Sequence, residues 1–183
     1  MSYTKLVTAP PRSAINGGMT PCPTGFLQRE YGEPNTDRWN DMMVSRSLGL
    51  PYRLETVIPA SRYRPEGHPL LFDRLRAGLD TLRKAAPVLY DALGLAGVRV
   101  VRTVRGNPKV WSNHAFGLAV DFTIDGRLDP YGDGTVQRGL LDLYSHLKRQ
   151  GLYWGAEFGR EDGMHFEVSA EAVMNAVRRG TFA

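Results

Sequence analysis

The clearest hydrophobic pattern in the chain lies between residues 70 and 94. Apolar residues recur at spacings of three and four, at Leu71, Phe72, Leu75, Leu79 and Leu82. This spacing places them on one face of an α-helix. Pro87 interrupts that helix or opens a further turn that carries Leu89 and Leu93, and Gly94 closes the turn.

Beyond this helix, the pattern predicts short strands interspersed with helices. Residues 97–105 alternate in side-chain direction and are rich in valine, which is typical of a strand. Further strands are predicted at residues 116–124 and 164–168, and further helices at residues 136–147 and, after Ser169 as N-cap, up to Arg179. Because hairpin-like turns join the strands, we expect an α+β fold with a small antiparallel sheet and flanking helices.

Residues 1–68 have a different character. They are rich in Pro, Gly, Thr and Asn and show little periodicity, apart from a short helix predicted between Asp37 and Leu48. We interpret them as an irregular arm packed on one globular unit of residues 69–183. The total of 183 residues fits a single domain.

Composition and charge narrow the range of partners. The net charge of +4 is compatible with any polyanion, but no dense Lys/Arg block with interleaved aromatics indicates nucleic acid. No apolar run approaches the ~20 residues needed to span a bilayer. The N-terminus lacks the order of a signal peptide, so we expect synthesis in the cytoplasm without a leader.

The cysteine count restricts any metal site. With Cys22 alone, the chain has no internal disulfide and no cysteine-based zinc site. A metal would therefore be bound by histidines and carboxylates. Of the four histidines, His68 and His146 have no metal-like companions nearby in the sequence.

His114 and Asp121 are separated by seven residues. On a continuous helix they would be ~10 Å apart along the axis, which is too far for one ion. A turn at Gly117 would let both side chains face one point. Asp121 lies in an apolar stretch, where a buried carboxylate needs a partner, and a metal ion would supply one.

A second cluster surrounds His165, whose apolar neighbours predict a strand entering the core. His165 would complete a His/Asp/His set and leave a fourth position open, as in catalytic zinc sites. Asp162 lies three residues earlier and would act as general base toward a water at that position. Each signal alone has a structural explanation, such as a satisfied core histidine or a turn aspartate. Their joint occurrence favours a metal site.

The pattern Ser112-x-His114-x-x-Gly117-x-Ala119-x-Asp121, followed by Asp162-x-x-His165, resembles the signature of the zinc D-alanyl-D-alanine carboxypeptidase family. That family includes VanY-type carboxypeptidases and the L-alanyl-D-glutamate endopeptidases of phage endolysins, and it shares its fold with the hedgehog domain. The likeness spans roughly residues 97–168. The segment 102–114, together with Trp154-Gly155 and the residues after His165, is similar to the branch with extensin-like C-terminal domains.

The resemblance implies a role for each matching residue. One Zn²⁺ would be bound by His114, Asp121 and His165, with Asp162 as the base and Glu161 as the second choice. An arginine would bind substrate and stabilise the oxyanion: we favour Arg102 for this role and assign Arg105 and Ser112 to substrate binding. On a regular strand Arg102 and Arg105 would face opposite sides, so only one would face the zinc unless the strand bends. Glu167 would support a ligand imidazole or be a simple surface charge.

The function that the resemblance implies is hydrolysis of the peptidoglycan stem peptide, as a D,D-carboxypeptidase or an L-Ala-D-Glu endopeptidase. Release by phage lysis or delivery by a contractile injection machine would bring the protein to the cell wall. The alternatives are a zinc-stabilised binding module of the hedgehog kind and a structural tail or baseplate protein with a vestigial site. Asp162 argues against the binding module, which needs no base beside its metal, whereas a vestigial tail protein would keep the ligands and show no turnover on any muropeptide.

Overall fold

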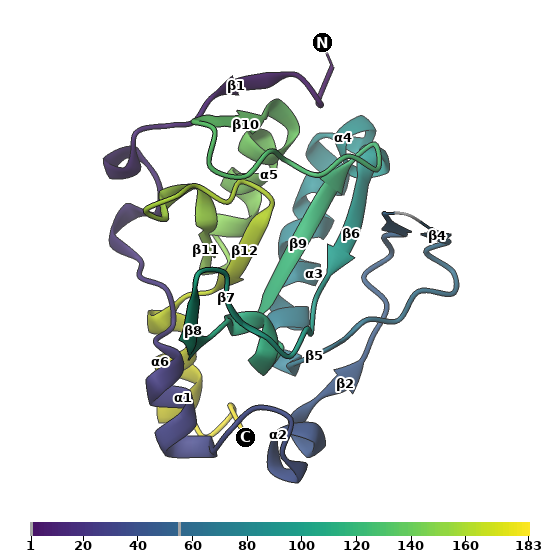
Figure 1. Ribbon diagram of the computed structural model, residues 1–183. Coiled ribbons are helices and arrows are strands. Elements are labelled where there is room, and N and C mark those ends of the chain that lie inside the picture. Colours follow the sequence, from purple (N-terminus) through teal and green to yellow (C-terminus); the bar gives the residue numbers. More distant parts are fainter. Residues whose placement is uncertain (1, 55) are drawn as a thin grey trace.

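The computed structural model describes residues 2–54 and 56–183 (Figure 1). Within these residues the chain forms six α-helices: α1 (Thr24–Tyr31), α2 (Asp37–Met42), α3 (Pro69–Ala85), α4 (Pro87–Ala92), α5 (Arg138–Lys148) and α6 (Ala170–Arg178). Four short 3-10 helices, η1 to η4, lie at Arg12–Ala14, Asn16–Gly18, Asn113–Phe116 and Gly155–Glu157. The mixed α+β composition agrees with the sequence prediction.

Six strands form the main sheet, in the order β11 (Leu152–Trp154), β12 (His165–Val168), β9 (Ala119–Ile124), β6 (Leu93–Gly97), β3 (Tyr52–Arg53) and β4 (Val57–Ile58). All neighbours are antiparallel except β3 and β6, which run parallel. Three two-stranded pairs complete the described residues: β1 (Leu6–Thr8) with β10 (Thr135–Gln137), β2 (Val44–Ser45) with β5 (Glu66–Gly67), and β7 (Thr103–Val104) with β8 (Asn107–Trp111).

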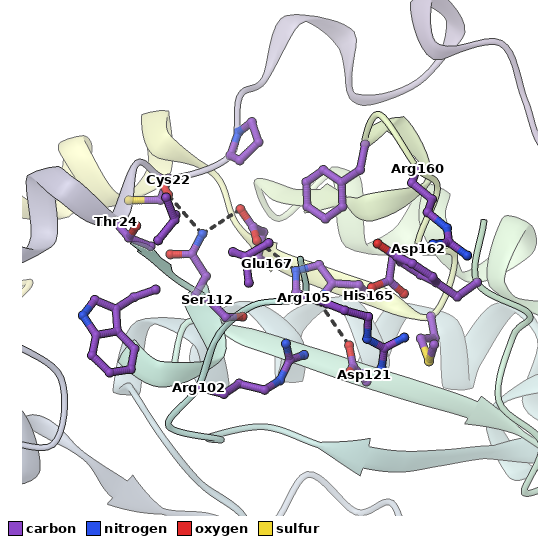
Figure 2. Close-up of a pocket in the computed structure, with 18 of the residues that line it drawn as sticks. Cys22, Thr24, Arg102, Arg105, Ser112, Asp121, Arg160, Asp162, His165 and Glu167 are labelled. Carbon is purple, nitrogen blue, oxygen red and sulfur yellow. Dashed lines mark hydrogen bonds and ion pairs between the residues drawn. The ribbon is translucent and has the colours of Figure 1, made fainter. Parts of the chain in front are cut away.

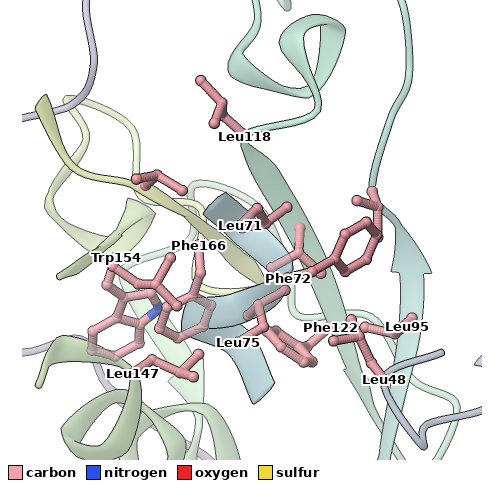
Figure 3. Packing of buried hydrophobic residues seen from close by; sticks show 14 of the residues in the cluster. Leu48, Leu71, Phe72, Leu75, Leu95, Leu118, Phe122, Leu147, Trp154 and Phe166 are labelled. Atoms are coloured by element: carbon pink, nitrogen blue, oxygen red, sulfur yellow. The ribbon is translucent and has the colours of Figure 1, made fainter. Parts of the chain in front are cut away.

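Helix α3 provides the apolar layer behind the main sheet. Pro69 occupies its first turn, where the missing N–H costs nothing, and His68 caps the helix by accepting a hydrogen bond from the backbone N–H of Leu70. The predicted apolar residues are buried on its inner face. Figure 3 shows Phe72 and Leu75 of α3 close to Phe122 of β9. The periodicity of residues 70–82 therefore identified the main core helix correctly.

The register of the two central strands determines where polar side chains emerge. Asp121 of β9 lies directly opposite His165 of β12. Side chains alternate along a strand, so their neighbours Val120, Phe122 and Phe166 turn to the other face, where all three are fully buried in the core. One face of the sheet is thus apolar and covered by helices, and the other presents Asp121 and His165 together.

The strand predicted at residues 97–105 is wrong. Strand β6 comes earlier and ends at Gly97, the first residue of the predicted stretch. Of residues 98–105, only Thr103 and Val104 are in a strand, the short hairpin strand β7. Helix α4 correspondingly ends at Ala92, so Gly94 does not close a helix but lies inside β6. A Cβ at Gly94 would come within 2.8 Å of Arg53 Cβ and 2.6 Å of Thr123 Oγ1. Close packing between neighbouring strands, and not a helix end, explains this glycine.

Two other boundaries differ from the sequence prediction. The second strand begins at Ala119 because the residues from Asn113 to Phe116 form a 3-10 helix. The helix expected from Val136 begins at Arg138, since Val136 belongs to β10. Strand β12 and helix α6, with Ser169 accepting a hydrogen bond from the N–H of Ala172, lie where they were predicted.

The segment before residue 69 contributes more regular structure than its composition indicated. Strands β3 and β4 extend the main sheet, and Leu27, Trp39 and Leu50 are buried in the common core. The division of the chain at residue 68 stays a prediction. Among the described residues, no helix has the length and apolar character needed to cross a membrane.

Candidate metal centre

A tight turn between Ser112 and Gly117 brings His114 to the polar face of the sheet. Ser112 Oγ accepts a hydrogen bond from the backbone N–H of His114 and begins the 3-10 helix, which Gly117 ends with a φ of 65°. A Cβ at Gly117 would lie 2.8 Å from the backbone N of His68 and 3.1 Å from Gly67 Cα. Only glycine combines this conformation with so close an approach of two backbones.

Three side chains converge beyond this turn. His114 Nε2 lies 3.1 Å from Asp121 Oδ1 and 3.1 Å from His165 Nδ1, and His165 Nδ1 lies 3.2 Å from Asp121 Oδ1. These residues form a group whose ligand atoms could hold a metal ion. The structure therefore brings together the three residues that the sequence singled out as metal ligands.

The second nitrogen of each imidazole is occupied by an acceptor. His114 Nδ1 lies 2.6 Å from the carbonyl oxygen of Val98, and His165 Nε2 lies 2.8 Å from Glu167 Oε2. A carbonyl and a carboxylate accept hydrogen bonds, so these nitrogens carry the protons in the neutral rings. The nitrogens that face Asp121 are then lone-pair donors, and three such atoms pointing at one another form a site for a cation.

Electrostatics supports the same interpretation. Burial acts to raise the pKa of Asp121, but the charges and hydrogen bonds of His114 and His165 outweigh it and hold that pKa well below its usual value. Burial acts to lower the pKa of His165, but hydrogen bonds to Asp121 and Glu167 raise it to about 10. The two carboxylates thus stabilise positive charge at this point, whether a proton or a metal ion supplies it.

The spacing of the three atoms fits zinc. A tetrahedral ion with bonds of ~2.0–2.1 Å holds its ligand atoms about 3.3 Å apart. The observed separations of 3.1 to 3.2 Å are close to that value. Two imidazoles and a carboxylate are also ligands that zinc takes in catalytic sites.

An open cavity of about 400 Å³ lies above the three residues. Asp121 and His165 form part of its floor (Figure 2), whereas His114 is fully buried and does not line it. The walls come from residues 21–24, from the β7–β8 hairpin, and from the segment that precedes β12. A fourth coordination position would therefore face the cavity and be accessible to water or a substrate.

Asp162, the predicted base, lines this cavity (Figure 2). Its Oδ1 atom is buried and has no hydrogen-bond partner among the described residues. Burial is the main cause that raises the pKa of Asp162, and the charge of His165 opposes it. Glu161, the second choice, instead accepts a hydrogen bond from the N–H of Gly134 and does not line the cavity.

Arg102 and Arg105 both line the cavity. The regular strand that would have pointed them to opposite faces is not formed, and the choice of Arg102 to face the metal position stays a prediction. Arg102 instead precedes the two-residue strand β7, and Arg105 follows that strand in the hairpin turn. Ser112 also lines the cavity, although its hydroxyl already caps the 3-10 helix.

A chain of buried hydrogen bonds connects His165 to the N-terminal segment. Glu167 Oε1 accepts a hydrogen bond of 2.9 Å from Asn113 Nδ2, which also donates to the carbonyl oxygen of Cys22 at 3.0 Å (Figure 2). Sequence reasoning missed Asn113, although it lies inside the matched motif at an unspecified position. It also missed Tyr131, Arg160 and residues 21–24 as cavity walls, because nothing local in the sequence relates them to the motif.

The remaining histidines are occupied elsewhere. His68 stacks on Phe182 and hydrogen-bonds its carbonyl oxygen through Nε2 at 2.8 Å. His146 Nδ1 lies 2.9 Å from Thr81 Oγ1. Neither lines the cavity.

Comparison with known proteins points to the same part of the chain. Residues 105–168 match the family model of D-alanyl-D-alanine carboxypeptidases. The match covers about a third of the chain. It begins in the β7–β8 hairpin, ends with β12, and contains His114, Asp121, Asp162 and His165. No curated protein matches the sequence. The similarity to this peptidase family therefore rests on the segment that forms the candidate metal centre.

Proposed function

We propose that the protein is a zinc-dependent peptidase that hydrolyses a peptide bond in the stem peptide of peptidoglycan. One observation carries the proposal: three lone-pair atoms of His114, Asp121 and His165 lie 3.1 to 3.2 Å apart at the floor of an open cavity. The similarity of residues 105–168 to D-alanyl-D-alanine carboxypeptidases supports the choice of a peptide substrate from the cell wall.

Bound zinc would supply Lewis acidity, polarising a carbonyl oxygen and lowering the pKa of water to about 7. Asp162 holds an unpartnered carboxylate oxygen on the cavity wall. It takes the proton from the attacking water and later returns it to the leaving amine. Its buried position keeps bulk water from solvating the carboxylate, which raises its affinity for that proton.

Arg102 and Arg105 supply positive charge in the same cavity, which Ser112 also lines. A guanidinium is always charged and donates several hydrogen bonds in one plane, so it suits both an oxyanion and a peptide carboxylate. We assign Arg102 to the developing oxyanion, and Arg105 and Ser112 to substrate binding.

The finer assignments belong to the same proposal. The arrangement of α3 and α5 behind a mainly antiparallel sheet is compatible with the fold shared by D,D-peptidases and hedgehog domains. Within that group we propose a D,D-carboxypeptidase or an L-Ala-D-Glu endopeptidase, of the VanY-type or extensin-like branch. Arrival at the wall by phage lysis or by a contractile injection machine is a further part of the hypothesis.

Digestion of purified muropeptides by the zinc-loaded protein, read by mass spectrometry, tests the function and identifies the bond. We expect one stem-peptide bond to be cut, and turnover to fall by about 10²-fold or more in Asp162→Asn while zinc stays bound. The matched control is Asp142→Asn, which removes a carboxylate from an exposed helix ion pair with Arg138. Intact muropeptides after incubation with the zinc-loaded protein would contradict the proposal and favour a zinc-stabilised binding module.

A further inference from the structure

One end of the cavity is formed by two arginines that share an aromatic ring. The guanidinium carbon of Arg105 lies 5.2 Å from the centroid of the Tyr131 ring, and that of Arg160 lies 4.5 Å from it. The three residues come from the β7–β8 hairpin, from the loop before β10, and from the loop before β12. All three line the cavity that contains Asp121 and His165.

The position of Arg160 is determined by close packing. Gly132 has a φ of 74°, and a Cβ there would overlap the Arg160 side chain, so the arginine lies directly against the loop backbone. Two hydrogen bonds tie the loops together: Gly132 N–H donates to the carbonyl oxygen of Glu161 at 3.1 Å, and Gly134 N–H donates to Glu161 Oε1 at 2.7 Å. The Arg160 guanidinium thus lies over Tyr131 while its side chain packs on the backbone of Gly132.

Neither guanidinium has an acidic partner. In the part of the chain that the structure describes, Arg105 and Arg160 form no ion pair, whereas Arg46, Arg99 and Arg138 each pair with a carboxylate at 2.7 to 2.9 Å. Their distances to one ring place the two guanidinium carbons at most about 10 Å apart, in a position to bind one ligand together. An anion between or beside them would relieve their mutual repulsion and accept charge-assisted hydrogen bonds.

The opposite end of the cavity has a different chemistry. Pro21, Pro23 and Trp111 line it, and the indole N–H of Trp111 is already bound to Glu33 Oε2 at 2.7 Å. Figure 2 shows Arg160 and Asp162 on one side of the cavity and Cys22 and Thr24 on the other, with Asp121 and His165 between them. A peptide with an anionic group on one side of the cleaved bond would bind in one direction only.

We propose that Arg105, Arg160 and Tyr131 form a subsite for a substrate carboxylate remote from the bond that is cut. The subsite makes the protein selective for stem peptides that retain a free carboxylate over those in which it is amidated. This inference rests on the proposed peptidase function, because it names the substrate class of the same cavity.

Isothermal titration of zinc-loaded Asp162→Asn protein with two synthetic stem peptides tests the subsite. The peptides are identical except that the carboxylates of one are amidated. We expect the free carboxylate peptide to bind about tenfold more tightly, and Arg160→Gln to reduce this preference to within about threefold. Arg160→Lys should retain an intermediate preference. The matched control is Arg149→Gln, which removes the same charge from an exposed position outside the cavity and should leave the preference unchanged.

Equal affinity for the two peptides would overturn the subsite, as would an unchanged preference in the Arg105→Gln, Arg160→Gln double variant. Inorganic phosphate should bind more weakly than the free peptide, and binding as tight as the peptide would overturn the assignment to a peptide carboxylate. The two proposals fail separately. A carboxylate preference in binding without cleavage of muropeptides would support the subsite and refute the peptidase, whereas cleavage without preference would refute the subsite alone.

Discussion

Glu167 accepts hydrogen bonds from two buried donors, and its replacement by glutamine gives a sharp test of how the metal centre is held. Oε2 accepts from His165 Nε2 at 2.8 Å, and Oε1 accepts from Asn113 Nδ2 at 2.9 Å. Glutamine has the same shape but one oxygen and one NH₂ group, so it can accept only one of these hydrogen bonds. The NH₂ group must then face another donor.

The conflict is relieved most easily if His165 changes its tautomer. The proton would move from Nε2 to Nδ1, the atom that lies 3.2 Å from Asp121 Oδ1 and faces the metal position. That proton competes with the metal, and the imidazole also loses a neighbouring negative charge. Partners of this kind change metal affinity by ~10–100-fold, which corresponds to about 1.4–2.7 kcal/mol. We therefore expect Glu167→Gln to bind zinc 10–100-fold more weakly than the wild type at neutral pH.

Competition with a chromophoric chelator measures this change. Glu171→Gln is the matched control. Glu171 lies in the first turn of α6, accepts hydrogen bonds from Thr20, and does not line the cavity. Zinc affinity of the control should equal that of the wild type. An unchanged zinc affinity in Glu167→Gln would show that Glu167 does not orient His165, and the reasoning about the tautomer would be refuted.

Three further predictions concern stability and reactivity. Gly117→Ala should lower the free energy of unfolding by about 2 kcal/mol or more in urea titrations, because a Cβ there would meet the His68 backbone. Gly180 has a similar φ of 64° but open space around it, so Gly180→Ala should lower the free energy of unfolding less. Equal losses in the two variants would contradict the packing argument. Burial lowers the pKa of His68 to about 4 from 6.5, so the folded state favours the neutral ring. The stabilising contribution of the neutral ring is present above pH 6.5 and decreases by roughly 3 kcal/mol as the pH falls to 4. His68→Gln should therefore lose less stability over this pH range than the wild type, and an identical pH profile of the two proteins would contradict the prediction. Burial raises the pKa of the Cys22 thiol to about 12, so alkylation by iodoacetamide at pH 8 should require unfolding, and rapid labelling of the native protein would be inconsistent with this environment.

Local periodicity was enough to predict the elements whose burial follows one regular face. Helices α3 and α6 have such faces, and the apolar neighbours of His165 indicated strand β12, which is buried at every position. The prediction failed at residues 97–105, where Val100, Val101 and Val104 are 44%, 43% and 41% exposed. Valine favours strands through the packing of its side chain, and alternation alone does not show whether a neighbouring strand is present.

The candidate site was predictable to the extent that its chemistry is local. The spacing of His114, Gly117 and Asp121 contains the turn that brings two ligand atoms together, and the neighbours of His165 indicated a buried strand. Contacts between distant segments left no such signal. Asn113 meets Cys22 across 91 residues, and Tyr131 meets Arg105 and Arg160 from separate loops. Those contacts depend on tertiary folding, which no window of the sequence contains.

Anomalous diffraction at the zinc edge, on crystals of the protein grown with one equivalent of zinc, tests the central claim most directly. We expect a single strong peak at about 2.0–2.2 Å from each of His114 Nε2, Asp121 Oδ1 and His165 Nδ1, with the fourth position facing the cavity. A peak elsewhere, or none at this position while the protein binds zinc in solution, would contradict the account.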